Sequence, residues 1–225
     1  MNNCKSHFAA PLTKRESADL FENQRIDFEE YKYIAGVDEA GRGPLAGPVV
    51  VASVILKPDA FHEALNDSKK LSEKKRDVLY DWVMDNSLAH SIEIIPAKTI
   101  DELNILGATM YGMETCVKNL QIKPNIVLFD GNITPIDYRA TKLLPDMRVD
   151  YDCLAVVKGD AKYANIAAAS ILAKVTRDRI MMELDKVYPQ YGFKDHKGYP
   201  TKKHIEMIDR YGICEEHRKS FNVRR

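Results

Sequence analysis

Apolar positions along the chain fall into short runs that are typical of strands. Residues 33–39 and 46–56 form two such runs around a segment rich in glycine and proline, and we expect them to pair as antiparallel strands. Shorter apolar runs at 91–95, 124–129 and 154–157 predict three further strands.

Helical patterns fill most of the intervening sequence. Apolar residues share one face over 72–86 and recur at spacings of three and four over 99–120, and an alanine-rich helix is expected from residue 160 or 161 to about 187. Two shorter helices are predicted near 201–211 and 215–220. An initial strand pair followed by strand–helix alternation predicts an α/β protein whose mixed sheet is flanked by helices.

Length, hydrophobicity and cysteine content narrow the class of protein. The 225 residues suit one domain with an appendage. No apolar run approaches the roughly 18 residues of a membrane span, and the first residues lack the apolar core of a secretory signal, so a cytoplasmic protein is expected. The four cysteines, Cys4, Cys116, Cys153 and Cys214, form no Cys-x-x-Cys pair, which fits thiols in a reducing compartment.

The charges are balanced overall but unevenly distributed. The chain has 33 Lys and Arg and 33 Asp and Glu residues, yet residues 196–225 hold eight basic and only four acidic ones. A basic surface beside an acidic pocket fits a protein that binds a polyanion and then cuts it. A solvated charged end of the chain is the alternative.

Four carboxylates stand where apolar runs end or a helix begins. Asp38 and Glu39 end the first strand, Asp130 ends a later one, and Asp160 precedes the long helix. Taken singly, Asp130 before Gly131 is also an ordinary turn residue and Asp160 an ordinary N-cap. Neighbouring strand ends can bring such side chains together, and adjacent acids are costly there unless a cation balances them.

The donor types favour a hard metal ion. Carboxylate oxygens select Mg²⁺ or Mn²⁺, and no set of His and Cys competes for zinc. Two such ions about 4 Å apart can hold a phosphate, activate water and stabilise the leaving oxygen. Because neighbouring strand residues point to opposite faces, we expect the backbone to leave strand geometry at Asp38 and Glu39.

Six short motifs occur in an order that points to a family. They are Asp38-Glu39-Ala40-Gly41-Arg42-Gly43-Pro44, Asp67-Ser68-Lys69-Lys70-Leu71-Ser72, Asp130-Gly131, Lys158-Gly159-Asp160, Ile166-Ala-Ala-Ala-Ser-Ile-Leu-Ala-Lys174 and His196-Lys-Gly-Tyr-Pro-Thr201. From about residue 33 to residue 221 the chain resembles the type 2 ribonucleases H, the ribonuclease HII family. The resemblance implies a ribonuclease H-like fold.

The resemblance also implies an activity and the residues that carry it. The protein would hydrolyse the RNA strand of RNA/DNA hybrids and cut 5′ of single ribonucleotides in duplex DNA, leaving a 3′-hydroxyl and a 5′-phosphate. Asp38 would be shared between the two ions. The implied catalytic metal ligands are Asp38, Glu39, Asp130 and Asp160.

A second group of residues is expected to contact the substrate. The bare backbone of the glycine loop next to the acids is suited to reading a 2′-hydroxyl, and the resemblance places Tyr199 at the deoxyribose that follows the ribonucleotide. Lys158 and Arg177 are further candidate phosphate contacts. The expected substrate-binding residues are Gly41, Arg42, Gly43, Lys69, Lys70, Asn165, Ser170, Lys174 and Tyr199.

The predicted organisation has three parts. Residues 1–30 form an N-terminal extension, 31–190 a ribonuclease H-like catalytic domain, and 191–225 a C-terminal helical substrate-binding segment. We expect the protein to act as a monomer and away from membranes.

Two alternatives remain open at this point. One is a type 3 ribonuclease H, which would act only on longer hybrids; Arg42 between the loop glycines and the short N-terminal extension disfavour it. The other is a non-catalytic nucleic-acid-binding module of the same fold, in which the four acids would be free to vary. A P-loop enzyme is excluded because no Gly-Lys-Ser/Thr follows the glycine loop.

Overall fold

A five-stranded mixed sheet forms the centre of the computed structural model, which describes residues 31–60, 62–65, 71–142 and 149–222. The strand order is β3-β2-β1-β4-β5. The first three strands pair antiparallel, whereas β4 and β5 run parallel to β1. The bounds are β1 (Ile34–Ala40), β2 (Val49–Leu56), β3 (Ser87–Ile95), β4 (Ile126–Asp130) and β5 (Asp152–Val156).

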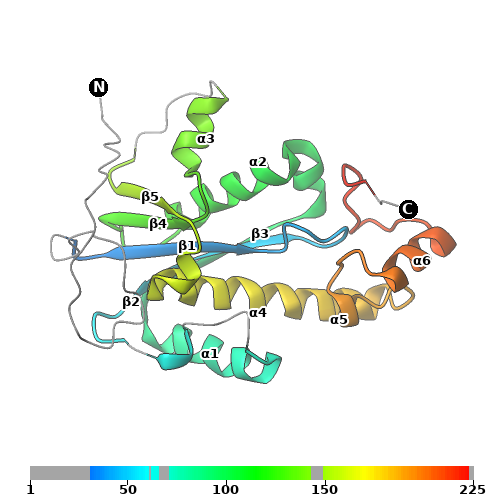
Figure 1. Ribbon diagram of the computed structural model, residues 1–225, viewed down its shortest axis with the longest axis horizontal. Coiled ribbons are helices and arrows are strands. Elements are labelled where there is room, and N and C mark those ends of the chain that lie inside the picture. The colour runs from blue at the N-terminus through cyan, green and yellow to red at the C-terminus, as the bar shows by residue number, and fades with distance from the viewer. Residues whose placement is uncertain (1–30, 61, 66–70, 143–148, 223–225) are drawn as a thin grey trace.

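Helices cover both faces of the sheet (Figure 1). On one face lie α2 (Ala97–Lys118) and α3 (Pro135–Thr141), and on the other lie α1 (Glu73–Asn86) and α4 (Ala164–Val187). Two further helices, α5 (Phe193–His196) and α6 (Lys202–Tyr211), lie near the C-terminal end of α4. No helix among these described residues is both long and apolar enough to cross a membrane.

Strand β2 contributes side chains to two hydrophobic cores, one on each face of the sheet. All eight of its residues are buried, because alternate side chains point to opposite faces and both faces carry helices. Val49 and Val51 pack into the core beneath α2, and Val50 and Ala52 into the core that α1 and α4 cover. The continuous apolar run in the sequence therefore reflects a strand that is buried on both sides.

Close packing of α4 against β1 depends on Gly36. A Cβ atom at this position would lie 2.2 Å from the backbone carbon of Asn165 and 2.2 Å from the backbone nitrogen of Ile166. Without a side chain at Gly36, the small residues Ala167 and Ala169 and the rest of that helix face can lie directly on the sheet. This contact fixes the depth at which α4 presents its side chains to the end of β1.

The expected strands and long helices are confirmed, and the errors concern short elements. Residues 215–220, predicted as a helix, form turns instead, since His217 makes an isolated bridge to Ala46 and the Arg218 amide donates to the Leu45 carbonyl. Helices α3 and α5 were not predicted. Helix α3 has seven residues and depends on a capping box between Thr134 and Asp137, and α5 has only four residues, so neither shows a usable periodicity.

Candidate active site

Two parallel strands end side by side and place two acids together. The pairing of β1 with β4 ends at Val37 and Phe129. Asp38 follows the first of these residues and Asp130 the second. The carboxylates that the sequence assigned to separate strand ends therefore lie at one edge of the sheet.

A cavity of about 430 Å³ opens at this edge. It is bounded by the end of β1, the loop that follows β1, one face of α4, and Tyr199 from the C-terminal segment. The residues lining it are Asp38, Glu39, Ala40, Gly41, Arg42, Gly43, Arg76, Asp130, Ser170, Lys174, Arg177 and Tyr199.

Both acids of the adjacent pair reach the cavity while the strand stays regular. Strand β1 continues through Ala40, with Asp38 opposite Ala52 and Glu39 opposite Val51. The expectation that the backbone leaves strand geometry here is therefore wrong. Because β4 no longer pairs with β1 beyond Val37, that side of β1 is open, and side chains from both faces reach the same space.

Asp38 is the most buried acid of the site. Its side chain accepts a hydrogen bond from the Glu39 amide at 2.7 Å and another from the Ser170 hydroxyl, and the residue is only 4% exposed. Burial, followed by the negative charges of Glu39 and Asp130, raises the pKa of Asp38 well above its usual value. A cation at this point would remove that penalty.

Glu39 has one satisfied oxygen and one without a partner. Its Oε1 lies 3.3 Å from Arg42 Nη1, whereas the buried Oε2 has no hydrogen-bond partner among the described residues. Burial raises the pKa of Glu39, and Arg42 opposes the shift. A buried acceptor without a donor is costly, so this oxygen is a natural ligand for a cation.

Asp130 contacts the start of the short 3-10 helix η3 (Gly159–Ala161), which carries Asp160. Asp130 Oδ1 accepts the Gly159 amide at 2.6 Å, which joins the end of β4 to η3. Asp160 is half-buried in η3 and is not among the residues that line the cavity. Of the four predicted acids, three border the cavity and Asp160 does not.

The acids fit a hard divalent cation but are not arranged around one. In the part of the chain that the structure describes, no three His, Cys, Asp or Glu side chains lie close enough together to hold a metal ion. The donor set is nevertheless all oxygen, with an unpartnered Glu39 oxygen and an Asp38 whose charge is disfavoured. These features fit Mg²⁺ or Mn²⁺, whose binding would require the side chains to turn inward.

Most of the predicted substrate contacts border the same cavity. Gly41, Arg42 and Gly43 form one wall, and Ser170, Lys174 and Tyr199 line others. Tyr199 is 44% exposed, and a Cβ atom at Gly43 would meet its ring at 3.5 Å. The loop and the aromatic ring therefore lie close together on the cavity wall.

Of four other predicted contacts, two lie away from the cavity wall and two fall outside the described residues. Asn165 is not part of the cavity wall, because its side chain accepts the Leu56 amide at 2.8 Å and so holds the end of β2. Lys158 is exposed and does not line the cavity. Lys69 and Lys70 lie outside the described residues, as does the predicted extension 1–30.

Arg177 borders the cavity but binds the protein's own backbone. It is 1% exposed, and it donates to the Pro48 carbonyl at 2.9 Å and to the Ala46 carbonyl at 3.2 Å. Burial lowers its pKa to about 10. The prediction that Arg177 contacts a substrate phosphate is therefore replaced by a structural role for its guanidinium beneath the glycine loop.

Sequence reasoning missed one basic residue of the cavity. Arg76, in α1, lines it and lies 3.9 Å from the buried carboxylate of Asp178, which also pairs with Lys174 at 2.7 Å. The sequence held one indication of this position. Arg76 follows the N-cap Ser72 by four residues, so both lie at the N-terminal end of α1. Nothing in the sequence indicated that α1 lies next to α4.

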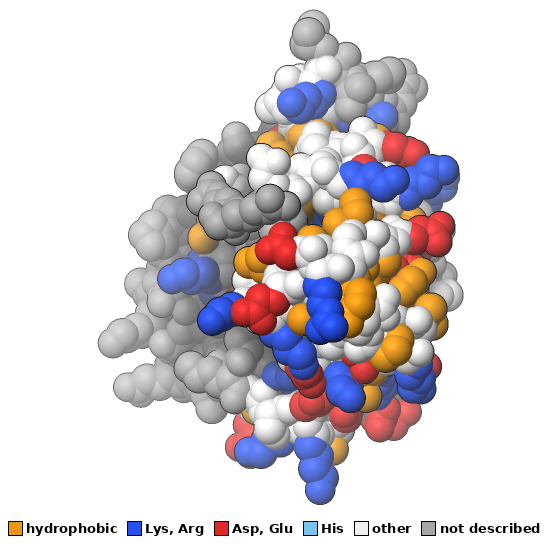
Figure 2. Space-filling view, turned by 90° about the vertical axis from the view of Figure 1, so that its right-hand side faces the viewer, with side chains coloured by type: hydrophobic (Ala, Val, Ile, Leu, Met, Phe, Trp, Pro, Cys, Tyr) orange, Lys and Arg blue, Asp and Glu red, His pale blue; other side chains and the backbone are white. Residues whose placement is uncertain are grey.

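The basic C-terminal part of the chain carries mixed charge in the folded protein. Figure 2 shows basic and acidic side chains interspersed over this end of the molecule. Lys203 pairs with Asp195 at 2.7 Å, and Arg218 is only 2% exposed. The excess of basic residues in the sequence therefore does not translate into one continuous basic surface.

Known proteins match this chain over most of its length. A family model described as Ribonuclease HII matches residues 35–224. The Ribonuclease HII of Acetivibrio thermocellus is 53% identical over 191 residues, which are 85% of this chain and 70% of that protein.

Solved structures show the same fold. The ribonuclease H2 of Pyrococcus horikoshii OT3 matches with a TM-score of 0.70 and 29% identity, covering 85% of this chain and 94% of that one. Bst-RNase HIII, solved in complex with Mn²⁺, matches with a TM-score of 0.63 and 18% identity, covering 85% of this chain and 67% of that one. The mixed α/β architecture expected from the sequence is confirmed.

Proposed function

The chain belongs to the ribonuclease HII family, and from this premise we propose that it cuts the RNA strand of RNA/DNA hybrids and cuts duplex DNA 5′ of a single embedded ribonucleotide. Its named relatives are ribonuclease H enzymes, a class that uses divalent metal ions. The products would carry a 3′-hydroxyl and a 5′-phosphate. We expect the enzyme to act as a monomer in the cytoplasm.

One observation carries the proposal. Acids from separate strands, Asp38, Glu39 and Asp130, border a single cavity together with the glycine loop and Tyr199. A hydrolase for a ribonucleotide phosphodiester needs carboxylates for cations and a sensor for the sugar in the same space. Structural packing alone gives no reason to bury these acids together, since their mutual repulsion disfavours the fold.

The protein's own groups would hold and orient the reacting atoms. Asp38, Glu39 and Asp130, with Asp160 turned inward from η3, would bind Mg²⁺ or Mn²⁺. When bound, two such ions supply activation of water and stabilisation of the leaving oxygen. The Ser170 hydroxyl, which donates to Asp38, keeps that carboxylate aimed at the cavity.

Other walls of the cavity would select the substrate. Backbone groups of the loop Gly41-Arg42-Gly43 would hydrogen-bond a 2′-hydroxyl, and Tyr199 would lie against the next deoxyribose. Lys174 and Arg76 border the cavity and are suited to phosphate oxygens. We therefore propose residues 31–190 as the catalytic part and residues 191–225 as a segment that contributes to substrate binding.

Cleavage of a defined duplex tests the proposal. A labelled DNA duplex with one ribonucleotide is incubated with the protein in Mg²⁺, in Mn²⁺ and in EDTA, and the cut is mapped on a sequencing gel. We expect a cut 5′ of the ribonucleotide with either metal and none in EDTA. A cut on the 3′ side, or full activity in EDTA, would contradict the proposal.

Two further measurements, cleavage of a longer hybrid and binding of both substrates, distinguish the alternative functions. A type 3 enzyme would leave the single ribonucleotide uncut and would cut only a longer hybrid. A non-catalytic binding module would cut neither substrate but would bind both. Asp130→Asn is the matched control, since it removes one charge at the cavity and keeps the side chain's size; activity within a few-fold of the wild type would exclude Asp130 from the metal site.

A further inference from the structure

Arg218 lies behind the glycine loop and is bound to it by all of its nitrogens. Nη2 donates to the carbonyls of Gly41 at 2.6 Å, Gly47 at 2.9 Å and Pro48 at 3.2 Å. Nη1 donates to the Arg42 carbonyl at 2.9 Å, and Nε donates to the Gly47 carbonyl at 3.0 Å. One side chain from the C-terminal segment therefore holds four carbonyls of the loop that follows β1.

The backbone that carries Arg218 is itself fixed. Its amide donates to the Leu45 carbonyl at 2.9 Å. The next two amides, of Lys219 and Ser220, donate to the carboxylate of Asp101 in α2 at 3.0 and 2.9 Å. Arg218 is thus anchored to the loop on one side and to α2 on the other, so its position does not depend on its own side chain.

Burial of the Arg218 charge lowers the stability of the fold, so stability alone does not explain it. Arg218 is 2% exposed, and among the described residues no carboxylate forms an ion pair with it. Burial and the neighbouring charge of Arg177 lower the pKa of Arg218 to about 9. Burying a charge against carbonyl dipoles without a counter-ion is unfavourable, which suggests that the geometry of the loop is what the contact secures.

The contacts determine where the loop's amides point. In a trans peptide the carbonyl and the following N–H point in opposite directions. Since the carbonyls of Gly41 and Arg42 face Arg218, the amides of Arg42 and Gly43 face away from it. These two residues line the cavity, whereas Arg218 does not, and neither amide donates a hydrogen bond within the described part of the chain.

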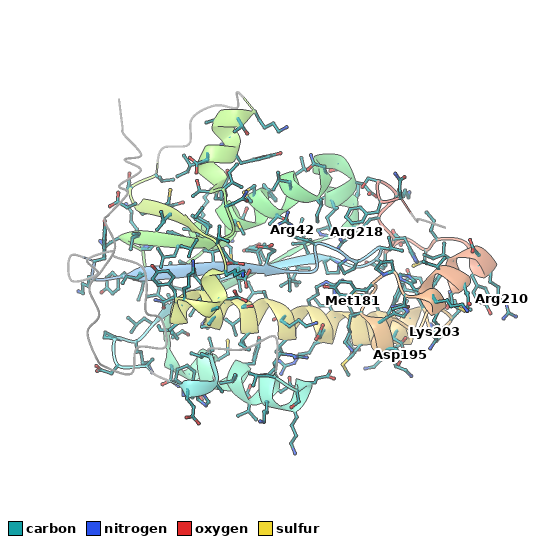
Figure 3. All side chains as sticks on the ribbon, in the orientation of Figure 1. Arg42, Met181, Asp195, Lys203, Arg210 and Arg218 are labelled. Atoms are coloured by element: carbon teal, nitrogen blue, oxygen red, sulfur yellow. The ribbon has the colours of Figure 1, made fainter. Side chains whose placement is uncertain are left out.

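We propose that Arg218 is a positioning residue for ribonucleotide recognition, because it turns the amides of Arg42 and Gly43 into the cavity as donors for the sugar's 2′-hydroxyl. The inference rests on the proposed function. It goes further by assigning the selection of ribose over deoxyribose to a residue that does not touch the substrate. Figure 3 shows Arg218 close to Arg42, whereas Arg210 lies out on α6.

Arg177 does not duplicate this role. Its guanidinium reaches the carbonyls of Pro48 and Ala46, which lie farther along the loop. It also lies where a side chain of Gly41 would be, since a Cβ atom there would be 2.0 Å from its Nε. Arg177 therefore supports the loop from α4, and of these two buried arginines only Arg218 holds the two peptide groups that face the cavity.

The test compares two duplexes that differ by one hydroxyl. Affinities are measured by fluorescence anisotropy, with Ca²⁺ replacing Mg²⁺, for a duplex with one ribonucleotide and for the same duplex made of DNA. The variant is Arg218→Lys, which keeps the charge but has one nitrogen in place of three. The control is Arg210→Lys, the same change at an exposed position of α6.

We expect Arg218→Lys to weaken binding of the ribonucleotide duplex about tenfold and to leave binding of the DNA duplex within twofold. Arg210→Lys should leave the ratio of the two affinities unchanged. A folded Arg218→Lys protein that keeps the wild-type ratio would overturn the inference, as would an equal loss for both duplexes. Equal affinity of the wild type for both duplexes would overturn it as well.

A measurement on the wild type covers the case in which Arg218→Lys does not fold. The amide signals of Arg42 and Gly43 are followed by NMR while the ribonucleotide duplex, and separately the DNA duplex, is added in EDTA. Shifts of both amides that are larger with the ribonucleotide support the inference, and identical shifts overturn it. Failure of the wild type to cleave in Mg²⁺ would instead contradict the proposed function, so the two failures are distinct.

Discussion

At the scale of single residues, the site concentrates groups that the fold would be more stable without. Asp38 is buried beside two other carboxylates, and Glu39 keeps a buried oxygen without a partner among the described residues. Both features disfavour the ionised, metal-free state. The side chains that we propose as metal ligands therefore oppose folding, and this opposition can be measured.

Asp38→Asn should separate activity from stability. Loss of a charge that would bind the ions is expected to reduce cleavage about 1,000-fold or more, since such ions contribute several kcal/mol to the transition state. In EDTA the free energy of unfolding should not fall, because a repelled buried charge is replaced by a neutral group of similar shape. Cleavage assays and urea denaturation check both parts, and a variant that is both active and destabilised would contradict them.

The acids that border the cavity could be found from the sequence, but the buried arginines behind it could not. Asp38, Glu39 and Asp130 could be predicted because a carboxylate at the end of an apolar strand is unusual in itself. Arg177 and Arg218 could not, since a basic residue in a helix or near the end of the chain is normally solvated. Their burial results from contacts with a loop more than 120 residues away in sequence, which no local pattern encodes.

At the scale of elements, the contact between β1 and α4 sets the geometry of the site. Gly36 lets the backbone of α4 approach β1, and the same helix carries Ser170, which donates to Asp38. The depth of one helix on one strand thereby determines where the Asp38 carboxylate points.

Gly36→Ala should disturb this contact. A Cβ atom 2.2 Å from two backbone atoms of α4 cannot be relieved by rotating a side chain, so we expect a loss of at least about 2 kcal/mol in the free energy of unfolding. Gly43→Ala is the stability control, because its Cβ would meet only the Tyr199 ring at 3.5 Å. Chemical denaturation of both variants measures the difference, and equal stabilities would show that α4 can move outward freely.

Helices α5 and α6 and the turn that follows them bring three histidines together. His204 Nδ1 lies 3.0 Å from the Tyr199 carbonyl and must donate to it. Its Nε2 therefore accepts from His217 Nε2 at 3.1 Å, and His217 Nδ1 in turn accepts the Cys214 amide at 3.0 Å. His196 stacks on His204 with ring centroids 4.5 Å apart. A proton added to His204 or His217 would set two donors against each other.

Acid should accordingly weaken the fold through His217. Burial and, second, the neighbouring His204 lower the pKa of His217 to about 4. A histidine in the unfolded chain has a pKa of about 6.5. The folded state thus favours the neutral ring. The contribution of the neutral His217 ring to stability is fully present above pH about 6.5. It is lost as the pH falls towards about 4, because the unfolded chain binds the proton first.

His217→Asn should flatten this dependence. We expect the variant to be less stable than the wild type at pH 8, since the hydrogen bond to His204 is lost, and to lose on the order of 2 kcal/mol less between pH 7 and pH 4. The wild type, measured in parallel at each pH, is the reference. Denaturation at a series of pH values provides the measurement, and a His217→Asn slope equal to that of the wild type would refute the assignment.

Secondary structure was predicted correctly where the hydrophobic pattern extends over several residues. The strands and the helices α1, α2, α4 and α6 were predicted within a few residues of their bounds. The turn at 215–220 was misread as a helix because its conformation comes from pairing with Ala46 and Leu45 in the glycine loop. That pairing is a tertiary contact, and it also brings Arg218 to the loop that borders the cavity.

At the scale of the whole molecule, one cavity joins parts of the chain that are far apart in sequence. Strand β1 supplies acids, α4 supplies Ser170 and Lys174, and the C-terminal segment supplies Tyr199. Charge on the molecule is balanced, and cations near the cavity are already paired, Lys174 with Asp178 and Arg42 with Glu39. Binding of a polyanion must then depend on a few localised contacts rather than on a broad basic field.

Salt dependence of binding can count those contacts and decide the role of Lys69 and Lys70. Each neutralised phosphate contributes about −0.9 to the slope of log K against log salt. Lys69→Gln and Lys70→Gln should each make the slope shallower by about 0.9 if the lysine contacts a phosphate. Lys118→Gln, exposed at the end of α2 and away from the cavity, should leave the slope unchanged. Anisotropy titrations of an RNA/DNA hybrid in EDTA at several salt concentrations provide the measurement. Unchanged slopes for both lysine variants would remove them from the substrate-binding surface and leave recognition to the cavity alone.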